Sequence, residues 1–399
     1  KASTLQGPPI APLAGPASSP AGDLPPLGTP DAKGGSWKLW NEETTTRPIV
    51  DAIDGAKSVV NVEFFGFSDG GKGSHVVNAL ERAARRGVEV NVFTDATSIP
   101  ALPLGSYFKM KSRIEDAGGT VKNNVRLPVV YDHDDTPGLK HVDHRKVVTV
   151  DGKTAFVGGI NFIKLEDGFH DSMLQLSGVD AARLAADQLD RWSRVGGAVS
   201  QRHREGVTAA LAGAALVPTS PTAMRIVANA PEQGRSELTD GYRDLIRSAK
   251  TRLWISSPGW SDQELIEELN QAAARGVDVR LVAPGKPPLG IPLINWVGQS
   301  HLRELVGHGA KAIEIPEVLH RKALIADDEV IFSSFNVTGR SKTADHEVGV
   351  RTKDPEFVAA IAGVLQRDMD RGTAITAESG SRAGRTIGNL IAQRFKISY

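Results

Sequence analysis

The fold of this chain is decided by the stretch His144-Arg145-Lys146-Val147-Val148-Thr149-Val150-Asp151. Its pattern is His-x-Lys-x4-Asp, and it returns 176 positions later as His320-Arg321-Lys322-Ala323-Leu324-Ile325-Ala326-Asp327. A short motif alone is weak evidence, whereas a motif that recurs together with its surroundings indicates an internal duplication.

The residues that follow each motif are matched as well. The first copy is followed by Gly158-Gly159-Ile160-Asn161 and then by His170-Asp171. The second is followed by Ser333-Ser334-Phe335-Asn336 and then by His346-Glu347, so the two carboxylates are again 176 positions apart. Each half thus carries one histidine, one lysine, one aspartate, one asparagine and one later carboxylate in the same order.

The flanking segments extend the duplication. Residues 249–260 align without gaps with residues 56–67, and residues 274–279 align with residues 85–90. Apolar runs at 59–65 and 88–93 predict buried strands, and the apolar spacing of 74–86 predicts a helix between them. This order is typical of a parallel sheet, whereas Asp151-Gly152 predicts an antiparallel hairpin after the motif strand.

This constellation resembles the phospholipase D superfamily and is most similar to its bacterial phospholipase D and cardiolipin synthase branches. The resemblance covers roughly residues 37–370. It implies an α/β fold in which two similar α/β/α halves, with mixed, mostly parallel sheets, pack as a pseudo-twofold dimer within one chain. The segments that we expect are a proline-rich leader or linker at 1–36, a first half at 37–199, a bridge at 200–222, a second half at 223–376 and a basic amphipathic tail at 377–399.

Composition limits the class of protein. The 399 residues include 47 basic and 47 acidic side chains and no cysteine. A neutral total is unusual for nucleic-acid-binding proteins, so no nucleic-acid partner is expected, and the lack of cysteine excludes disulfides and cysteine-bound zinc. No apolar run is long enough for a transmembrane helix, and the chain starts at Lys1. We therefore expect a monomer that is secreted or extracytoplasmic, with a soluble cytoplasmic protein as the alternative.

The repeated residues fit chemistry at a phosphodiester. Such a group is an anion with a poor leaving group, so an enzyme has to supply cations, a nucleophile and a proton donor. Lysine ammonium groups supply charge to the non-bridging oxygens, and neutral donors assist them. No metal or other cofactor is expected. The phosphate-binding residues that we expect are Lys146, Lys322, Asn161, Asn336 and Ser334.

The two motif histidines are expected to supply the nucleophile and the proton donor. One neutral imidazole attacks phosphorus and forms a phosphohistidine, and the other donates a proton to the leaving oxygen. Asp171 and Glu347 are expected to orient the imidazoles. The resemblance implies His144 as the nucleophile and His320 as the acid, an assignment that the residues alone leave open. Four motif residues are expected to be structural: Asp151, Asp327, Gly158 and Gly159.

The predicted function is a metal-independent phospholipase D that cleaves the distal phosphodiester of glycerophospholipids, with some transfer to alcohols and transient contact with a membrane surface. Cardiolipin synthases commonly carry amino-terminal membrane helices, and their absence from this sequence favours phospholipase D. The alternatives are a cardiolipin synthase-like phosphatidyltransferase, a nuclease or other phosphodiesterase of the superfamily, and a non-catalytic binding protein.

Four further segments carry weaker expectations. Residues 132–135 are expected to lie in a solvated loop, and residues 207–216 to form a short helix. Residues 289–297 are expected to pack in the core or to line an acyl-chain site. The tail, whose apolar residues include Ile387 and Leu390, is expected to be an amphipathic helix docked on the body, with contact to a membrane surface as the alternative.

Overall fold

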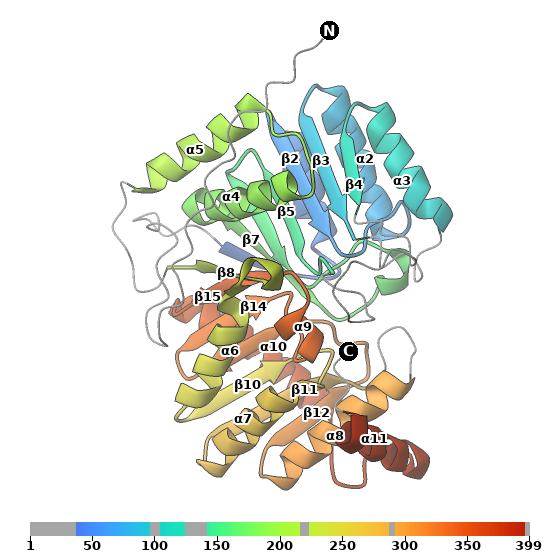
Figure 1. Cartoon of the computed structure of the whole chain (residues 1–399), viewed down its shortest axis with the longest axis vertical. Helices are drawn as coiled ribbons and strands as arrows, with labels where there is room; N and C mark the ends of the chain where they lie inside the picture. Colours follow the sequence, from blue (N-terminus) through green and yellow to red (C-terminus); the bar gives the residue numbers. More distant parts are fainter. Residues whose placement is uncertain (1–36, 96–103, 124–141, 216–222, 287–291, 396–399) are drawn as a thin grey trace.

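Two apolar segments form interior strands of two separate β-sheets, one in each half of a computed structural model (Figure 1). They are β2 (Val59–Phe64) and β10 (Arg252–Ser256). The structure describes residues 37–95, 104–123, 142–215, 223–286 and 292–395. The expectations for residues 1–36, 132–135 and 289–291 lie outside these described residues.

The two sheets share one strand order. Among the described residues, the first sheet runs β1-β7-β6-β5-β2-β3-β4. The second repeats this order as β8-β15-β14-β13-β10-β11-β12, and adds β9 and β16 at its edges. The other strands of the first sheet are β1 (Trp37–Asn41), β3 (Glu89–Thr94), β4 (Thr120–Asn123), β5 (Lys146–Val150), β6 (Thr154–Gly158) and β7 (Ser172–Ser177); those of the second are β8 (Arg225–Ala230), β9 (Arg235–Ser236), β11 (Asp278–Pro284), β12 (Lys311–Ile315), β13 (Ala323–Ala326), β14 (Glu329–Ser333), β15 (Glu347–Thr352) and β16 (Thr373–Ala374).

The α/β class and the mixed sheets are confirmed, but the expectation of mostly parallel strands is wrong. Within the described sheets, parallel pairing is confined to β2-β3-β4 and β10-β11-β12, where a helix connects each strand to the next. The motif strands instead lie in hairpins, in which β5 pairs with β6 and β13 pairs with β14. A short turn reverses the chain direction, so each hairpin is antiparallel. Strand pairs that are distant in sequence, such as β2 with β5 and β1 with β7, are antiparallel as well.

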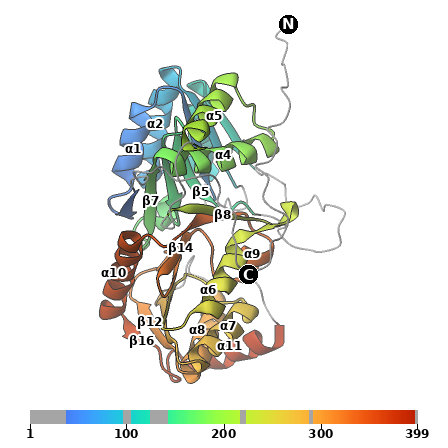
Figure 2. The ribbon, with the colours of Figure 1, turned by 90° about the vertical axis from the view of Figure 1, so that its left-hand side faces the viewer.

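Helices cover both faces of each sheet. In the first half α1, α2 and α3 pack on one face and α4 on the other, and in the second half α6, α7 and α8 are opposed by α10. Figure 2 shows that α1 and α2 lie on the same side of the molecule as α10, whereas α4 lies on the side of α6 and α7. The bounds are α1 (Thr46–Gly55), α2 (Lys72–Arg85), α3 (Leu104–Asp116), α4 (Gly178–Arg194), α6 (Glu237–Ser248), α7 (Gln263–Ala274), α8 (Pro292–Gly307) and α10 (Pro355–Arg371).

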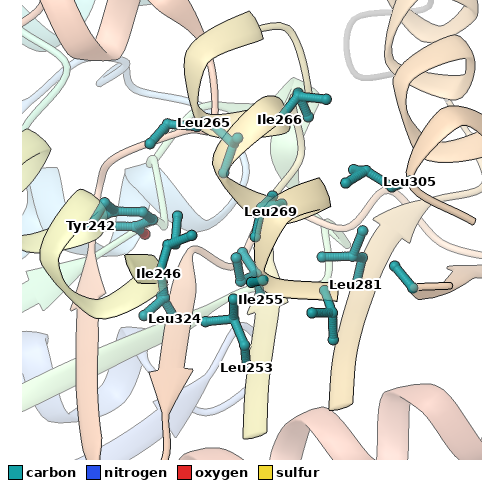
Figure 3. Close-up of a cluster of buried hydrophobic side chains, with 14 of the residues drawn as sticks. Tyr242, Ile246, Leu253, Ile255, Leu265, Ile266, Leu269, Leu281, Leu305 and Leu324 are labelled. Carbon is teal, nitrogen blue, oxygen red and sulfur yellow. The ribbon is translucent and has the colours of Figure 1, made fainter. Parts of the chain in front are cut away.

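Aliphatic side chains fix these helices over the sheet. Ile246 of α6 and Leu265 and Leu269 of α7 meet Leu253 and Ile255 of β10, and each is at most 1% exposed (Figure 3). Leu265 and Leu269 lie on one face of α7 because they are four residues apart. Burying such a side chain stabilises a fold by roughly 1.5–3 kcal/mol. This packing holds the sheet whose strands carry the second motif.

The two halves share one core and exchange backbone hydrogen bonds. Val157 of β6 and Phe332 of β14 belong to the same buried apolar cluster, which α4 and α10 complete. The His144 N–H donates to the carbonyl of His346 at 3.0 Å, and the His320 N–H donates to the carbonyl of His170 at 2.9 Å. These reciprocal contacts are what a pseudo-twofold relation between the halves requires.

The bridge between the halves is more ordered than the apolar pattern predicts. Helix α5 (Gln201–Ala215) begins six residues earlier than the expected residue 207, because the Ser200 hydroxyl caps it by accepting the His203 N–H at 3.0 Å. Val207 packs with Leu189 of α4. The bridge helix is therefore attached to the first half.

The tail forms helix α11 (Arg382–Phe395), which lies against α8. A Cβ atom on Gly388 would lie 2.4 Å from the Trp296 carbonyl oxygen, so a glycine allows the close approach. Ile387 and Leu390 are 38% and 52% exposed. The tail is thus a helix docked on the body, as expected, and it docks through its small residues and leaves Ile387 and Leu390 exposed. In α8, Val297 is buried in the core.

Candidate active site

Each motif histidine is held by a carboxylate from the other half. Nδ1 of His144 lies 3.0 Å and 3.1 Å from the two carboxylate oxygens of Glu347. Nδ1 of His320 lies 2.7 Å from Oδ2 of Asp171. A carboxylate on Nδ1 fixes the tautomer and the orientation of the ring, and it leaves Nε2 for chemistry.

The exchange of carboxylates follows from the backbone pairing between the halves. Asp143, just before His144, forms a parallel bridge with His346, just before Glu347. Leu319, just before His320, forms the equivalent bridge with His170. Each carboxylate stands at the start of a strand, β15 or β7, and that start lies beside the motif of the other half.

Both motif lysines are fully buried beside their histidines. Lys146 and Lys322 are 0% exposed. The Lys146 ammonium donates to the carbonyl of His144 at 2.6 Å, and Lys322 makes the same contact with His320. Burial and the charge of Lys322 lower the pKa of Lys146 to about 7, and burial lowers the pKa of Lys322 to about 8. A phosphate bound between them would favour the charged forms.

His144 lies in a cationic and largely dry setting. Burial, followed by the charges of Lys146 and Lys322, lowers the pKa of His144 well below its usual range. The ring of Phe65 packs against the imidazole with a centroid distance of 5.2 Å. The imidazole is therefore neutral at neutral pH, which is the state that a nucleophile requires.

The two motif asparagines have different surroundings. Asn161 is buried, and its Oδ1 accepts the Gly66 N–H at 3.1 Å. Its Nδ2 donates to the carboxylate oxygens of Glu166 at 3.0 Å and 2.9 Å. Asn336 is half-buried, and its Oδ1 has no hydrogen-bond partner among the described residues. The sequence repeat does not reveal this difference.

The structure places Ser334 on a carboxylate. Its hydroxyl donates to Oε2 of Glu347, and a phosphate contact would require this hydrogen bond to break. Ser341, which the sequence analysis missed, donates to Oε1 of Glu347 at 2.6 Å. Together the two hydroxyls hold the carboxylate that orients His144.

Gly158 and Gly159 allow two strands to approach closely at Asp171. A Cβ atom on Gly159 would lie 2.5 Å from both carboxylate oxygens of Asp171. On Gly158 it would lie 2.5 Å from the carbonyl oxygen of Ser172. Any side chain at these positions would displace the carboxylate that orients His320.

The motif aspartates anchor strands away from the phosphate site. Asp151 accepts three backbone N–H groups at the start of β2, at 2.8–2.9 Å, and Asp327 accepts three at the start of β10, at 2.9–3.0 Å. Both residues have positive φ angles, 53° and 50°. Each aspartate therefore makes the turn after its own strand and fixes the neighbouring strand.

The arginine between the motif histidine and lysine has a partner that the sequence analysis did not identify. Arg145 donates to Asp187 of α4 at 2.6 Å, and Arg321 pairs with Asp368 of α10. Both guanidinium groups are buried. The repeat of arginine at the same motif position was the available signal, because a buried cation needs a partner.

Within the described residues, no group of three or more histidine, aspartate or glutamate side chains is arranged to hold a metal ion. None of the described helices is long and apolar enough to cross a membrane.

Comparison with known proteins identifies the family. The family model described as "Cardiolipin synthase, PLD-like domain" matches residues 49–191 and 242–369, which include both motifs. This chain belongs to that family. The phospholipase D superfamily and the cardiolipin synthase-like branch are thereby confirmed, and the chain is an enzyme of the phosphodiesterase and phosphatidyltransferase type.

Relatives within the cardiolipin synthase-like family share about a quarter of their residues with this chain. Cardiolipin synthase A from Pseudomonas entomophila is 28% identical over 373 residues, which cover 89% of this chain and 74% of the relative. The probable cardiolipin synthase YwiE from Bacillus subtilis is 28% identical over 372 residues, which cover 90% and 70%.

Two solved structures share the fold of this cardiolipin synthase-like protein. The phosphatidylserine synthase from Haemophilus influenzae superposes with a TM-score of 0.68 at 13% identity, covering 91% of this chain and 94% of its own. The polyphosphate kinase from Porphyromonas gingivalis superposes with a TM-score of 0.53 at 14% identity, covering 83% and 50%. At these identities the likeness concerns the fold alone.

These findings correct the predicted function. The relatives are named as cardiolipin synthases, so the prediction of a hydrolytic phospholipase D that degrades lipids is wrong, and the phosphatidyltransferase alternative is favoured. The error arose because the start of the sequence was taken as evidence against amino-terminal membrane helices. The relatives are longer than this chain, so its first residue carries no information about such helices. The expected secretion and the monomeric state stay predictions.

Proposed function

We propose that this protein is a phosphatidyltransferase of the cardiolipin synthase type, which moves a phosphatidyl group from a phospholipid to the hydroxyl of an acceptor alcohol. The proposal rests on one observation. Nδ1 of each motif histidine is hydrogen-bonded to a carboxylate from the other half, and each histidine lies beside a buried lysine. Two such histidines acting on one phosphate can form a covalent intermediate and then resolve it.

In the proposed first step, Nε2 of His144 attacks phosphorus. The bond from phosphorus to the headgroup oxygen breaks, and His320 gives its proton to that oxygen. The lowered pKa of His144, caused by burial and the two lysines, supports this direction of attack. Lys146 and Lys322 bind the non-bridging oxygens, with Asn161 and Asn336 as neutral donors.

In the second step the acceptor resolves the phosphohistidine. Its hydroxyl gives a proton to His320, its oxygen bonds to phosphorus, and the bond from phosphorus to Nε2 breaks. Cardiolipin consists of two phosphatidyl groups joined through one glycerol, so phosphatidylglycerol as the acceptor yields cardiolipin. The same intermediate transfers to any small alcohol that reaches it.

Both substrates are proposed to be lipids, so the protein has to make at least transient contact with a membrane surface. Exposed apolar side chains support this contact, because they lose water when they enter a lipid surface. In the described part of the chain the large ones are Leu104, Phe108, Leu165, Ile387 and Leu390.

The test uses vesicles of phosphatidylglycerol, with products read by mass spectrometry. We expect cardiolipin and free glycerol in equal amounts, a phosphatidyl-alcohol when a primary alcohol is added, and no product from His144→Ala. Phosphatidic acid as the sole lipid product at every alcohol concentration would overturn the proposal.

A further inference from the structure

One of the matched positions at which the two halves differ lies close to the motif asparagine. The fifth residue after the motif asparagine is Glu166 in the first half and Ser341 in the second. Ser341 is fully buried, and its hydroxyl is directed at Glu347. Glu166 is half-buried and has both carboxylate oxygens on the amide of Asn161. A carboxylate thus stands beside one motif asparagine and has no equivalent beside the other.

The position of Glu166 at the phosphate site is fixed by Asn161. The side-chain Oδ1 of Asn161 accepts the Gly66 N–H, so the Nδ2 of the same amide has to point toward Glu166. Glu166 also acts electrostatically on both motif lysines, as one of the charges that favour their protonated forms. The residue lies on the one-turn helix η2 (Lys164–Glu166), beside the exposed Leu165.

A carboxylate at this place does not suit the phosphate itself, because two anions repel each other. It does suit a ligand that presents hydroxyl groups. A carboxylate has two oxygens and no donor of its own, so it accepts hydrogen bonds from hydroxyls. Acidic side chains bind the ribose hydroxyl of nucleotides in this way. In the proposed reaction the acceptor always presents a hydroxyl, whereas the donor headgroup does so only in some phospholipids, so we assign this contact to the acceptor.

We propose that Glu166 binds the acceptor by accepting a hydrogen bond from the hydroxyl next to the one that attacks phosphorus, which makes the site selective for vicinal diols such as a glycerol headgroup. The inference rests on the proposed transferase function. During the second step Glu166 gains no proton, since the attacking hydroxyl gives its proton to His320 as the bond from phosphorus to Nε2 breaks. Its contribution is to binding and orientation of the acceptor.

A different role for Glu166 makes a different prediction. If the carboxylate only held Asn161, or only adjusted the charge of the lysines, its removal would change transfer to every acceptor by the same factor. Selective loss of one class of acceptor requires direct contact with that class. A comparison of isomeric acceptors therefore separates these roles.

The experiment is a competition between 1,2-propanediol and 1,3-propanediol at equal concentration, with phosphatidylglycerol vesicles as the donor. The two acceptors contain the same atoms, but only the first has neighbouring hydroxyls. Wild-type protein should favour the 1,2-isomer by about tenfold, the effect of one hydrogen bond to a charged group. The two phosphatidyl-diols have the same mass, so the 1,3-isomer is supplied deuterium-labelled. Their ratio is then read by mass spectrometry and does not depend on the amount of active protein.

Three variants complete the design. Glu166→Ala should abolish the preference, and Glu166→Gln, which keeps one accepting oxygen, should reduce it. Asp167→Asn is the matched control, because it removes the same charge one residue away, where Asp167 accepts the Lys72 N–H, and it should keep the preference. Transfer to 1-propanol should be nearly unchanged in Asp167→Asn, and in the two Glu166 variants it is the reference against which the loss of transfer to 1,2-propanediol is measured.

The inference is overturned, with the transferase intact, by a wild-type protein that does not discriminate between the diols or by a Glu166→Ala variant that retains the preference. An equal loss for all acceptors would also overturn it. If the wild type forms no phosphatidyl-alcohol with any acceptor, the proposed function fails and this inference fails with it.

Discussion

At the scale of single residues, the site holds two lysines whose charged forms are disfavoured by burial. Among the described residues no carboxylate contacts Lys146 or Lys322 directly, and each lysine donates to a backbone carbonyl. Their ammonium groups are poorly solvated, so the charged form is costly. A phosphate oxygen supplies the missing negative charge, and binding therefore draws protons onto the lysines.

The pH dependence of transfer should show this suppression. In the free enzyme, both lysines lose their protons as the pH rises through about 7 to 8, and His144 gains a proton only below its usual pKa. We expect kcat/KM for transfer from phosphatidylglycerol to fall above neutral pH and to fall again on the acid side, below about pH 6.5. At saturating lipid the alkaline decline should move upward, because bound phosphate restores the charges.

Initial rates at low and at saturating lipid measure the two pH profiles. An alkaline decline in kcat/KM that begins only above about pH 9.5 would show that the lysines titrate like ordinary exposed lysines.

Sequence reasoning found the residues that repeat and missed the residue that does not. The matched positions of Asp171 and Glu347 marked both as orienting carboxylates, but equal spacing in both halves cannot tell which histidine each serves. Glu166 was not identified from the sequence because the matched residue in the second half is a serine, so no repeat marks it. Its side chain becomes visible as part of the site only when the Asn161 amide is placed in three dimensions.

At the scale of elements, the starts of strands β7 and β15 place Asp171 and Glu347 beside the motif histidine of the opposite half. We expect Glu347→Gln to alter the ring-nitrogen NMR shift of His144 and to leave that of His320 unchanged, and Asp171→Asn to do the reverse. Each variant should lower transfer on the order of a hundredfold, because the ring loses its fixed tautomer. If each substitution altered the histidine of its own half, the crossed arrangement would be wrong.

The turn at Asp327 has a consequence for stability. Besides three backbone N–H groups, its carboxylate accepts the Thr251 hydroxyl at 2.6 Å. We expect Asp327→Ala to lower the free energy of unfolding by about 1–3 kcal/mol, since these donors lose their partner and alanine disfavours positive φ. Asp327→Asn should cost less, because asparagine keeps one acceptor and tolerates this backbone conformation.

Urea denaturation of the wild type and the two Asp327 variants measures this. Although burial opposes it, hydrogen bonds from Thr251 and the backbone hold the pKa of Asp327 far below its usual range. The advantage over Asp327→Ala is therefore complete above about pH 4 and is lost as the pH falls below that value. An advantage that grows with acidity would contradict this account.

Helices and strands with a regular spacing of apolar residues were predictable from the sequence, and those fixed by tertiary contacts were not. The apolar spacing located α2, and Asp151-Gly152 located the hairpin of β5 and β6. Strand β1 was missed because two of its five residues are exposed and it is held by pairing with β7. The direction of most strand pairs was misjudged, because the pattern of the strand–helix–strand units was extended to the hairpins.

At the scale of the whole molecule, the halves are joined through a common core as well as through the site. Val157 and Phe332 belong to one cluster, and the two histidines depend on contacts from the opposite half. We expect one cooperative unfolding transition in which the two halves lose structure together. Fluorine NMR of 5-fluorotryptophan-labelled protein in urea would follow both, because Trp192 reports on the first half and Trp260 on the second.

Coincident midpoints for both tryptophans and for enzymatic activity are the expected result. A tryptophan in one half that unfolds at a clearly lower urea concentration than its counterpart would mean that the shared core does not couple the halves.

The crossing of the carboxylates also bears on how such a protein arises by gene duplication. A chain with a single half has no carboxylate of its own for its histidine, so it can act only as a symmetric pair of identical copies that lend carboxylates to each other. A mutation that damages β7 or β15 also disables the motif of the opposite copy. After the two copies became one chain, neither could therefore lose its function while the other kept it. The copies did diverge around this arrangement, because Glu347 stands where the first copy has Asp171, and Ser341, which holds Glu347, stands where the first copy has Glu166.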